Sequence, residues 1–187
     1  IGAIFFLSRP EKPVIVDATK LVKEDSNKLS SDSAQLTIVE FGDYQCPACG
    51  AAHAPLKQAI SEFPGQVNFV FRHFPLAQHK NAQLAAQAAE AAKLQGKLWE
   101  MHDKLYEMQT EWDEEGNALE FFQKYATELG MDINKFNTDI NADSVKQKIS
   151  NDMADGSALG VNSTPTIYFN DQLHKGGIGY QDFKTAI

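Results

Sequence analysis

Cysteine is scarce in this chain, and its scarcity limits what the two copies can do. Cys46 and Cys49 are the only cysteines in 187 residues. A structural zinc site takes about four ligands, no second Cys-x-x-Cys exists, and only His53 lies close in sequence. A static disulfide across two residues would constrain the unfolded chain little. We therefore expect no metal here and favour a redox-active disulfide, with a static disulfide and a zinc site as the alternatives.

Basic residues and long apolar runs are also few. The 17 lysines and arginines face 25 aspartates and glutamates, which gives a formal net charge of −8. This balance argues against nucleic-acid binding. The apolar run Ile1–Leu7 is too short to cross a bilayer, which takes about 20 residues. We interpret residues 1–33 as the remnant of a signal peptide or membrane anchor followed by a linker that has room for a short edge strand at residues 13–16. The alternative for the apolar run is an ordinary buried strand or helix end.

The cysteines lie where a predicted strand meets a predicted helix. Residues 36–41 are rich in β-branched and aromatic types, and residues 49–63 carry apolar side chains at helical spacing. A helix that begins near Cys46 would direct unpaired backbone N–H groups and the positive end of its dipole at that sulfur. Pro47 suits the first turn of such a helix. The pattern predicts a lowered thiol pKa at Cys46 and a small disulfide ring with Cys49.

The rest of the chain predicts an α/β protein interrupted by helices. A second strand at 67–74 completes a β-α-β unit, and residues 79–159 are helical in pattern almost throughout. A strand after Pro165, a return strand at 173–178 and a helix from Tyr180 follow. The predicted order is β-α-β, helical insertion, β-β-α. Within the insertion we expect Trp99 and His102 to be packing residues rather than ligands.

Four segments in this order resemble the DsbA-like thiol–disulfide oxidoreductases. They are residues 39–41, the motif Cys46-Pro47-Ala48-Cys49, residues 95–103, and residues 163–166 with the sequence Ser-Thr-Pro-Thr. The resemblance covers residues 34–187. It implies an α/β, thioredoxin-like fold made of residues 34–78 and 160–187, with residues 79–159 as an inserted all-helical lobe.

The resemblance also implies a role for each matching residue. Cys46 would be the nucleophile and Cys49 the partner that closes or resolves the bond, with no cofactor beyond that disulfide. Glu40 would be a buried acid that exchanges a proton with Cys49, the alternative being an exposed strand residue. The remaining residues would form the substrate site: Pro165 as a cis-proline, Thr164 beside the thiolate with a hydroxyl that can donate to sulfur, and Ser163, Pro47 and Ala48 as substrate contacts.

The implied function is to introduce disulfides into unfolded or secreted proteins outside the cytoplasm. The implied partners are reduced polypeptides and a quinone-linked, DsbB-like membrane protein that reoxidises the chain, and we expect a monomer. A reductase or isomerase with the same fold is one alternative. A chaperone or interaction domain with a structural disulfide is another, and its activity would survive Cys46→Ala.

Overall fold

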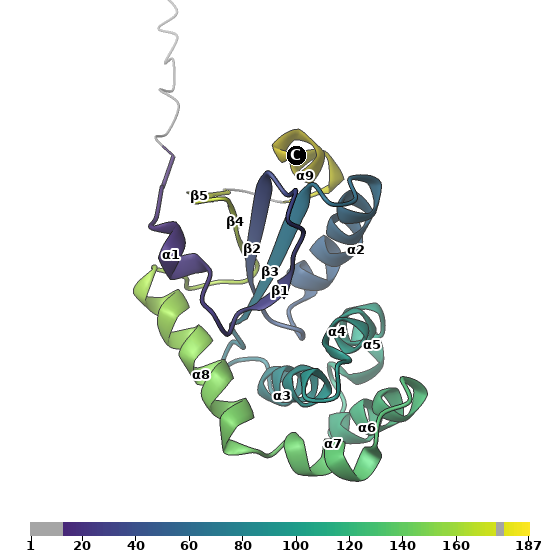
Figure 1. Ribbon diagram of the computed structural model, residues 1–187. Coiled ribbons are helices and arrows are strands. Elements are labelled where there is room, and N and C mark those ends of the chain that lie inside the picture. Colours follow the sequence, from purple (N-terminus) through teal and green to yellow (C-terminus); the bar gives the residue numbers. More distant parts are fainter. Residues whose placement is uncertain (1–12, 175–177) are drawn as a thin grey trace, which may run out of the picture.

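A computed structural model of the chain describes residues 13–174 and 178–187. Its β-strands form one five-stranded sheet in the order β1-β3-β2-β4-β5 (Figure 1). Strands β2 and β3 are parallel, and the other neighbouring pairs are antiparallel. The strands are β1 Asn27–Leu29, β2 Leu36–Gly42, β3 Val67–His73, β4 Thr166–Phe169 and β5 Gln172–Leu173. The helices are α1 Ala18–Leu21, α2 Pro47–Glu62, α3 Ala82–Lys93, α4 Leu98–Glu107, α5 Gln109–Trp112, α6 Ala118–Glu128, α7 Ile133–Asp139, α8 Asp143–Ala158 and α9 Tyr180–Ala186.

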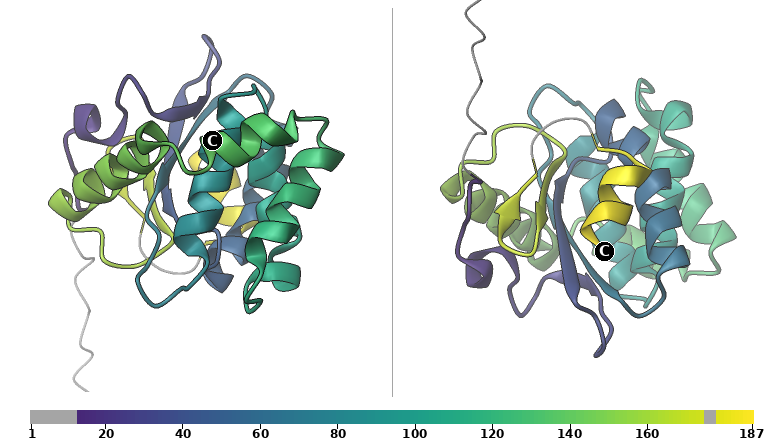
Figure 2. Two further views of the ribbon diagram at one scale, coloured as in Figure 1. Left: turned by 90° about the horizontal axis from the view of Figure 1, so that it is seen from below. Right: turned by 90° about the horizontal axis from the view of Figure 1, so that it is seen from above.

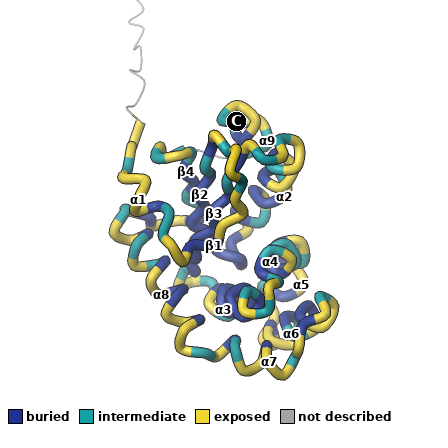
Figure 3. Tube along the Cα trace, viewed as in Figure 1, coloured by how far each residue is buried: buried dark blue, intermediate teal, exposed yellow. Residues whose placement is uncertain are grey.

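Both faces of the sheet are covered, which explains why β2 is buried along almost its whole length. Helices α2 and α9 lie on one side of the strands, and α1 and α8 lie on the other (Figure 2). Successive side chains of a strand point to opposite faces, so Ile38 packs into the core beneath α2, whereas Val39 and Phe41 pack toward α1 and α8. The same alternation directs Glu40 to the α2 side. The strands form the dark centre of the burial map (Figure 3).

Helices α3 to α8 form the predicted insertion between β3 and β4. Its interior holds fully buried aromatic side chains, namely Trp112, Phe122, Tyr125 and Phe136. These residues belong to the same hydrophobic core as the α2 face of the sheet. The α/β fold with a helical insertion is therefore confirmed, and the insertion is packed directly against the sheet domain.

The N-terminal part of the described chain differs from a plain linker. Strand β1 pairs with β3, and Leu21 of α1 is fully buried. Ile15 forms an isolated bridge with Gln172. The segment before residue 34 therefore extends the sheet beside β3. Without it, β3 would be an edge strand with unpaired backbone groups. The apolar run at residues 1–7 lies outside the described residues, as does part of the return strand that we expected at 173–178.

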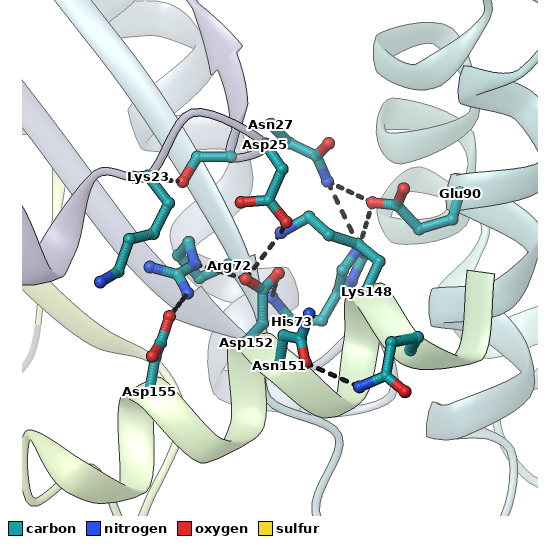
Figure 4. A network of polar contacts seen from close by, with 12 residues as sticks. Lys23, Asp25, Asn27, Arg72, His73, Glu90, Lys148, Asn151, Asp152 and Asp155 are labelled. Carbon is teal, nitrogen blue, oxygen red and sulfur yellow. Dashed lines mark hydrogen bonds and ion pairs between the residues drawn. The ribbon is translucent and has the colours of Figure 1, made fainter. Parts of the chain in front are cut away.

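A buried polar network ties β3 to α8, α3 and the N-terminal segment (Figure 4). Arg72 is 1% exposed, and its Nε donates to Asp152 Oδ1 over 2.5 Å. Asp152 also accepts from the backbone N–H of His73 and from Lys148 Nζ. His73 Nε2 in turn lies 2.8 Å from Glu90 Oε1. The network fixes where the end of the insertion returns to the sheet.

No helix within the described ranges is long and apolar enough to cross a bilayer.

Candidate active site: a cysteine pair at the start of a helix

Cys46 is the N-cap residue of α2, directly before Pro47 at the first helical position. Both cysteines are free thiols. Cys46 is 7% exposed and Cys49 is fully buried, while Pro47 and Ala48 between them are exposed. A substrate thiol therefore reaches Cys46 before Cys49. The helix begins where the sequence predicted, so its free N–H groups lie at Cys46.

The two thiols have opposite electrostatic environments. The pKa of Cys46 is lowered to about 5, chiefly by a hydrogen bond from the Cys49 thiol. Burial acts the other way, but it is outweighed by the hydrogen bonds that the Thr164 hydroxyl and the backbone N–H groups of Cys49 and Ala48 can donate to a thiolate. Burial raises the pKa of Cys49 well above the usual value, and the hydrogen bond to Cys46 adds to this. At neutral pH the pair therefore holds one thiolate, on Cys46, and one proton, on Cys49.

The turn before β4 lies against Cys46. The Thr164–Pro165 peptide bond is cis, and Cys46 Sγ donates to the backbone carbonyl of Thr164 over 3.3 Å. Thr164 Oγ1 is buried and has no hydrogen-bond partner in this dithiol form, so its proton is free for a thiolate. Ser163 is exposed and Pro165 is partly exposed. Cys46 and Thr164, which lie 118 positions apart in the sequence, are therefore in contact at the Cys46 sulfur.

Glu40 is buried in the middle of the sheet, with only 2% of its surface exposed. It pairs in register with Phe71 of β3 and Ile167 of β4, and its Oε1 has no hydrogen-bond partner. Burial, followed by the negative charge on Cys46, raises its pKa to about 8. The alternative of an exposed strand residue is therefore wrong. A carboxyl group with this pKa holds a proton at neutral pH and can release it without a large change in pH.

Several residues that hold the cysteine loop were not predicted from the sequence. Gln109 of α5 donates from Nε2 to the backbone carbonyls of Tyr44 (2.7 Å) and Cys46 (3.0 Å). Its Oε1 packs so closely on α2 that a Cβ on Gly50 would lie 2.6 Å away. The helical insertion thus directly supports the turn that presents Cys46. No local pattern marks Gln109, because its partners lie more than 60 residues earlier.

Asp43 supports the same loop from the other side. Its Oδ1 accepts from the backbone N–H of Gln45, and its Oδ2 accepts from the backbone N–H of Leu76 and lies 2.7 Å from His79 Nδ1. Gln45 Oε1 then accepts from the backbone N–H of Asn81. The position of Asp43 directly before the motif was visible in the sequence, but its distant partners were not.

His102 is buried between α4 and the sheet, and Trp99 lies half-buried beside it. His102 is 2% exposed and makes an edge contact with the Phe71 ring, and its Nδ1 lies 3.0 Å from Tyr44 Oη. The ring of Trp99 contacts those of Phe69 and His102. His53, one turn beyond Cys49 on α2, stacks on the Tyr106 ring. These contacts place an aromatic cluster directly behind the buried cysteine.

Comparison with known proteins identifies relatives over almost the whole chain. A protein-family model described as thioredoxin matches residues 27–187. A thioredoxin-like oxidoreductase from Silicibacter pomeroyi DSS-3 superposes with a TM-score of 0.78 at 29% identity, covering 91% of this chain and 95% of that one. The thiol–disulfide exchange protein α-DsbA2 from Wolbachia pipientis shares the fold with a TM-score of 0.77 at 24% identity, covering 89% and 87%.

The curated relatives are much longer than this chain. The Na⁺/H⁺ antiporter NhaA 1 of Mycolicibacterium vanbaalenii is 36% identical over 177 residues, which is 91% of this chain but 27% of that protein. The family match and the solved structures agree with the fold described above. The chain therefore belongs to the thioredoxin family, and it shares its fold with a thioredoxin-like oxidoreductase and with a DsbA-type thiol–disulfide exchange protein.

Proposed function

We propose that this chain is a dithiol oxidase that transfers its Cys46–Cys49 disulfide to reduced, unfolded polypeptides. The observation that carries the proposal is the contrast between the two thiols, with the pKa of Cys46 lowered to about 5 and that of Cys49 raised. A stabilised Cys46 thiolate favours the reduced form of the pair. A protein whose reduced form is stabilised gives its disulfide away.

The first step begins at the more exposed sulfur. A client thiolate attacks Cys46 Sγ, the Cys46–Cys49 bond breaks, and a mixed disulfide forms between client and Cys46. Cys49 leaves as a thiolate and needs a proton at once, because burial strongly disfavours its charged form. We assign that proton to Glu40, which is protonated at neutral pH and buried on the same side of the sheet.

The second step releases the product. A second client thiolate attacks the client sulfur of the mixed disulfide, and Cys46 leaves as a thiolate that Thr164 and the start of α2 stabilise. The client has lost two electrons to form a disulfide, and the Cys46–Cys49 pair has gained them. Pro47, Ala48, Ser163 and the cis Thr164–Pro165 bond line the approach to Cys46, so we propose them as the client-binding surface.

The partners and the location follow from the same chemistry. Disulfides are made and kept in oxidising compartments, so we propose an extracytoplasmic location. An oxidase must be reoxidised, and we propose a quinone-linked membrane protein for this step. We propose that the chain works as a monomer, because one protomer carries both cysteines and the whole approach to them.

A single-turnover assay tests the proposal. The disulfide form is mixed with reduced, unfolded ribonuclease A, and loss of client thiols is followed with regain of ribonuclease activity. We expect wild type to oxidise the client and Cys46→Ser, which cannot form the Cys46–Cys49 disulfide, to be inactive. Cys49→Ser, mixed instead with scrambled ribonuclease, should accumulate a mixed disulfide, because Cys46 attacks a client disulfide and no Cys49 is present to release the client.

The assay also separates the alternatives. A chain that leaves reduced ribonuclease unchanged but, in its dithiol form, rescues scrambled ribonuclease would be an isomerase or reductase. If Cys46→Ser still keeps the unfolded client from aggregating, the chain would be a chaperone.

A further inference from the structure

A second group of reactive side chains lies behind the cysteine pair and takes no part in the proposed reaction. His53 of α2 meets His102 and Asp103 of α4, and one nitrogen or oxygen from each lies within 4.8 Å of the other two. His53 and His102 are 7% and 2% exposed, and the Asp103 side chain is 34% exposed. The sequence analysis considered His53 as a possible ligand and took His102 as a packing residue, and nothing local joins the two because His102 and Asp103 lie some 50 residues after His53.

Three features of this group are typical of a metal site. His53 Nε2 is buried and has no hydrogen-bond partner, although it lies 3.3 Å from Asp103 Oδ1. That separation matches the roughly 3.3 Å expected between two ligands of one tetrahedral ion at bond lengths of about 2.0–2.1 Å. His102 Nδ1 is engaged with Tyr44 Oη, which orients the ring and leaves Nε2 as its ligand atom. Such a second contact is usual for metal-binding histidines.

The group opens into a cavity that has space for an ion and its water. The cavity has a volume of about 240 Å³ and lies between α2 and α4, with Trp99, Phe69 and Ile60 among its apolar lining. A water molecule occupies about 30 Å³ in the liquid. His53, His102 and Asp103 all border this space. An ion bound there can therefore keep water as its fourth ligand.

We propose that His53, His102 and Asp103 form a binding site for a divalent transition-metal ion of the zinc type. Two imidazoles and one carboxylate with an open position are the donor set of many zinc sites, whereas Mg²⁺ and Ca²⁺ prefer oxygen ligands. The site departs from our expectation of no metal at the cysteines, and also from our expectation that His102 is a packing residue rather than a ligand. It joins the helix that carries Cys46 and Cys49 to the helical insertion.

Lys57 gives the site a specific test. Its Nζ lies 2.7 Å from Asp103 Oδ2 and 2.8 Å from Glu107 Oε1, and the side chain is 50% exposed. In the metal-free protein Lys57 supplies the positive charge beside Asp103. A bound cation must share Asp103 with it. Removing the lysine charge should therefore tighten metal binding by about 3- to 10-fold.

Zinc binding is measured on the full chain in its disulfide form, so that no cysteine thiolate competes for the ion. A titration against a chromophoric zinc chelator should give one Zn²⁺ per chain, and Mg²⁺ should not displace it. Asp103→Asn and His53→Gln should each weaken binding by about tenfold or more, and Lys57→Gln should tighten it. His174→Gln, a histidine beside Phe169 at another part of the sheet, is the matched control and should leave the affinity unchanged.

Two results would overturn the proposal. One is that wild-type disulfide protein takes up no Zn²⁺ at micromolar concentrations. The other is that Asp103→Asn and Lys57→Gln, both at partly exposed positions and folded by circular dichroism, bind Zn²⁺ with wild-type affinity. If His53→Gln does not fold, Asp103→Asn and Lys57→Gln alone decide the outcome.

Discussion

Thr164 acts on the Cys46 sulfur through two separate groups. Its backbone carbonyl accepts from the thiol, and its side-chain hydroxyl favours the thiolate. Thr164→Val keeps the carbonyl and the side-chain shape but removes the hydroxyl. A hydrogen bond to a charged group contributes about 1.5–3 kcal/mol, so we expect the pKa of Cys46 to rise by about one to two units.

The rate of alkylation by iodoacetamide against pH measures this pKa. Wild type should show a midpoint near pH 5, and Thr164→Ser, which restores the hydroxyl, should remain close to wild type. An unchanged midpoint in Thr164→Val would show that the Thr164 hydroxyl does not stabilise the Cys46 thiolate.

Glu40 should make the stability of the protein depend on pH. Its pKa is raised from 4.5 to about 8, so the folded state favours the protonated form. The free energy of unfolding that the protonated carboxyl contributes is fully present below pH 4.5. It is lost as the pH rises through 8, where Glu40 ionises in the folded protein. Glu40→Gln stays neutral throughout. Relative to this variant, wild type should lose about 4 kcal/mol of unfolding free energy between pH 5 and pH 9.

Urea denaturation of the disulfide forms at a series of pH values tests this expectation, because no thiol then titrates in the same range. The burial that chiefly raises the Glu40 pKa is unchanged in that form. Parallel pH profiles for wild type and Glu40→Gln would show that Glu40 ionises normally.

Helix α5 holds the cysteine loop through one side chain. Gln109→Ala removes the donor to two buried carbonyls, those of Tyr44 and Cys46. Leaving such groups unpaired costs about 1–3 kcal/mol, and we expect that loss in the free energy of unfolding. Gln123→Ala is the matched control, because Gln123 donates only to Asn137 on the exposed surface. Equal losses of unfolding free energy in Gln109→Ala and Gln123→Ala would contradict the claim that Gln109 supports the cysteine loop.

Helix α8 depends on its buried ion pair with β3. Arg72→Met should lower the free energy of unfolding by about 3–5 kcal/mol, because it leaves Asp152 as a buried charge with fewer partners. Lys135→Met removes an exposed pair with Asp139 on α7 and should change stability by less than about 1 kcal/mol. Chemical denaturation measures both. A small effect of Arg72→Met would mean that Lys148 and water compensate Asp152 fully.

The sequence predicted elements well where the signal is local. β2, α2 and β3 follow from β-branched runs and helical spacing, and each lies within about two residues of its expected bounds. β1 was missed, because a short polar strand such as Asn27–Leu29 has no pattern of its own and exists through its pairing with β3. The same reason explains why Arg72 and Gln109 went unnoticed, since their partners lie far along the chain.

The site as a whole was predicted in part. The cysteine motif and the Thr164–Pro165 pair were recognised, and the structure brings them into contact at Cys46 Sγ. Their catalytic roles stay proposals. The helical insertion was predicted as a lobe, but its support of the loop through Gln109 is a property of tertiary packing. The aromatic cluster behind Cys49 also depends on the insertion, because α4 supplies His102 and Tyr106.

The central claim concerns the whole molecule: it stabilises its own reduced form and so donates disulfides. Equilibration of the Cys46/Cys49 pair in defined glutathione buffers at pH 7 gives its reduction potential directly. The account predicts a value well above that of the cytosolic glutathione pool, which lies at about −220 to −260 mV by biochemical measurement. A value near that of thioredoxin, about −270 mV, would contradict the claim and make the chain a reductase.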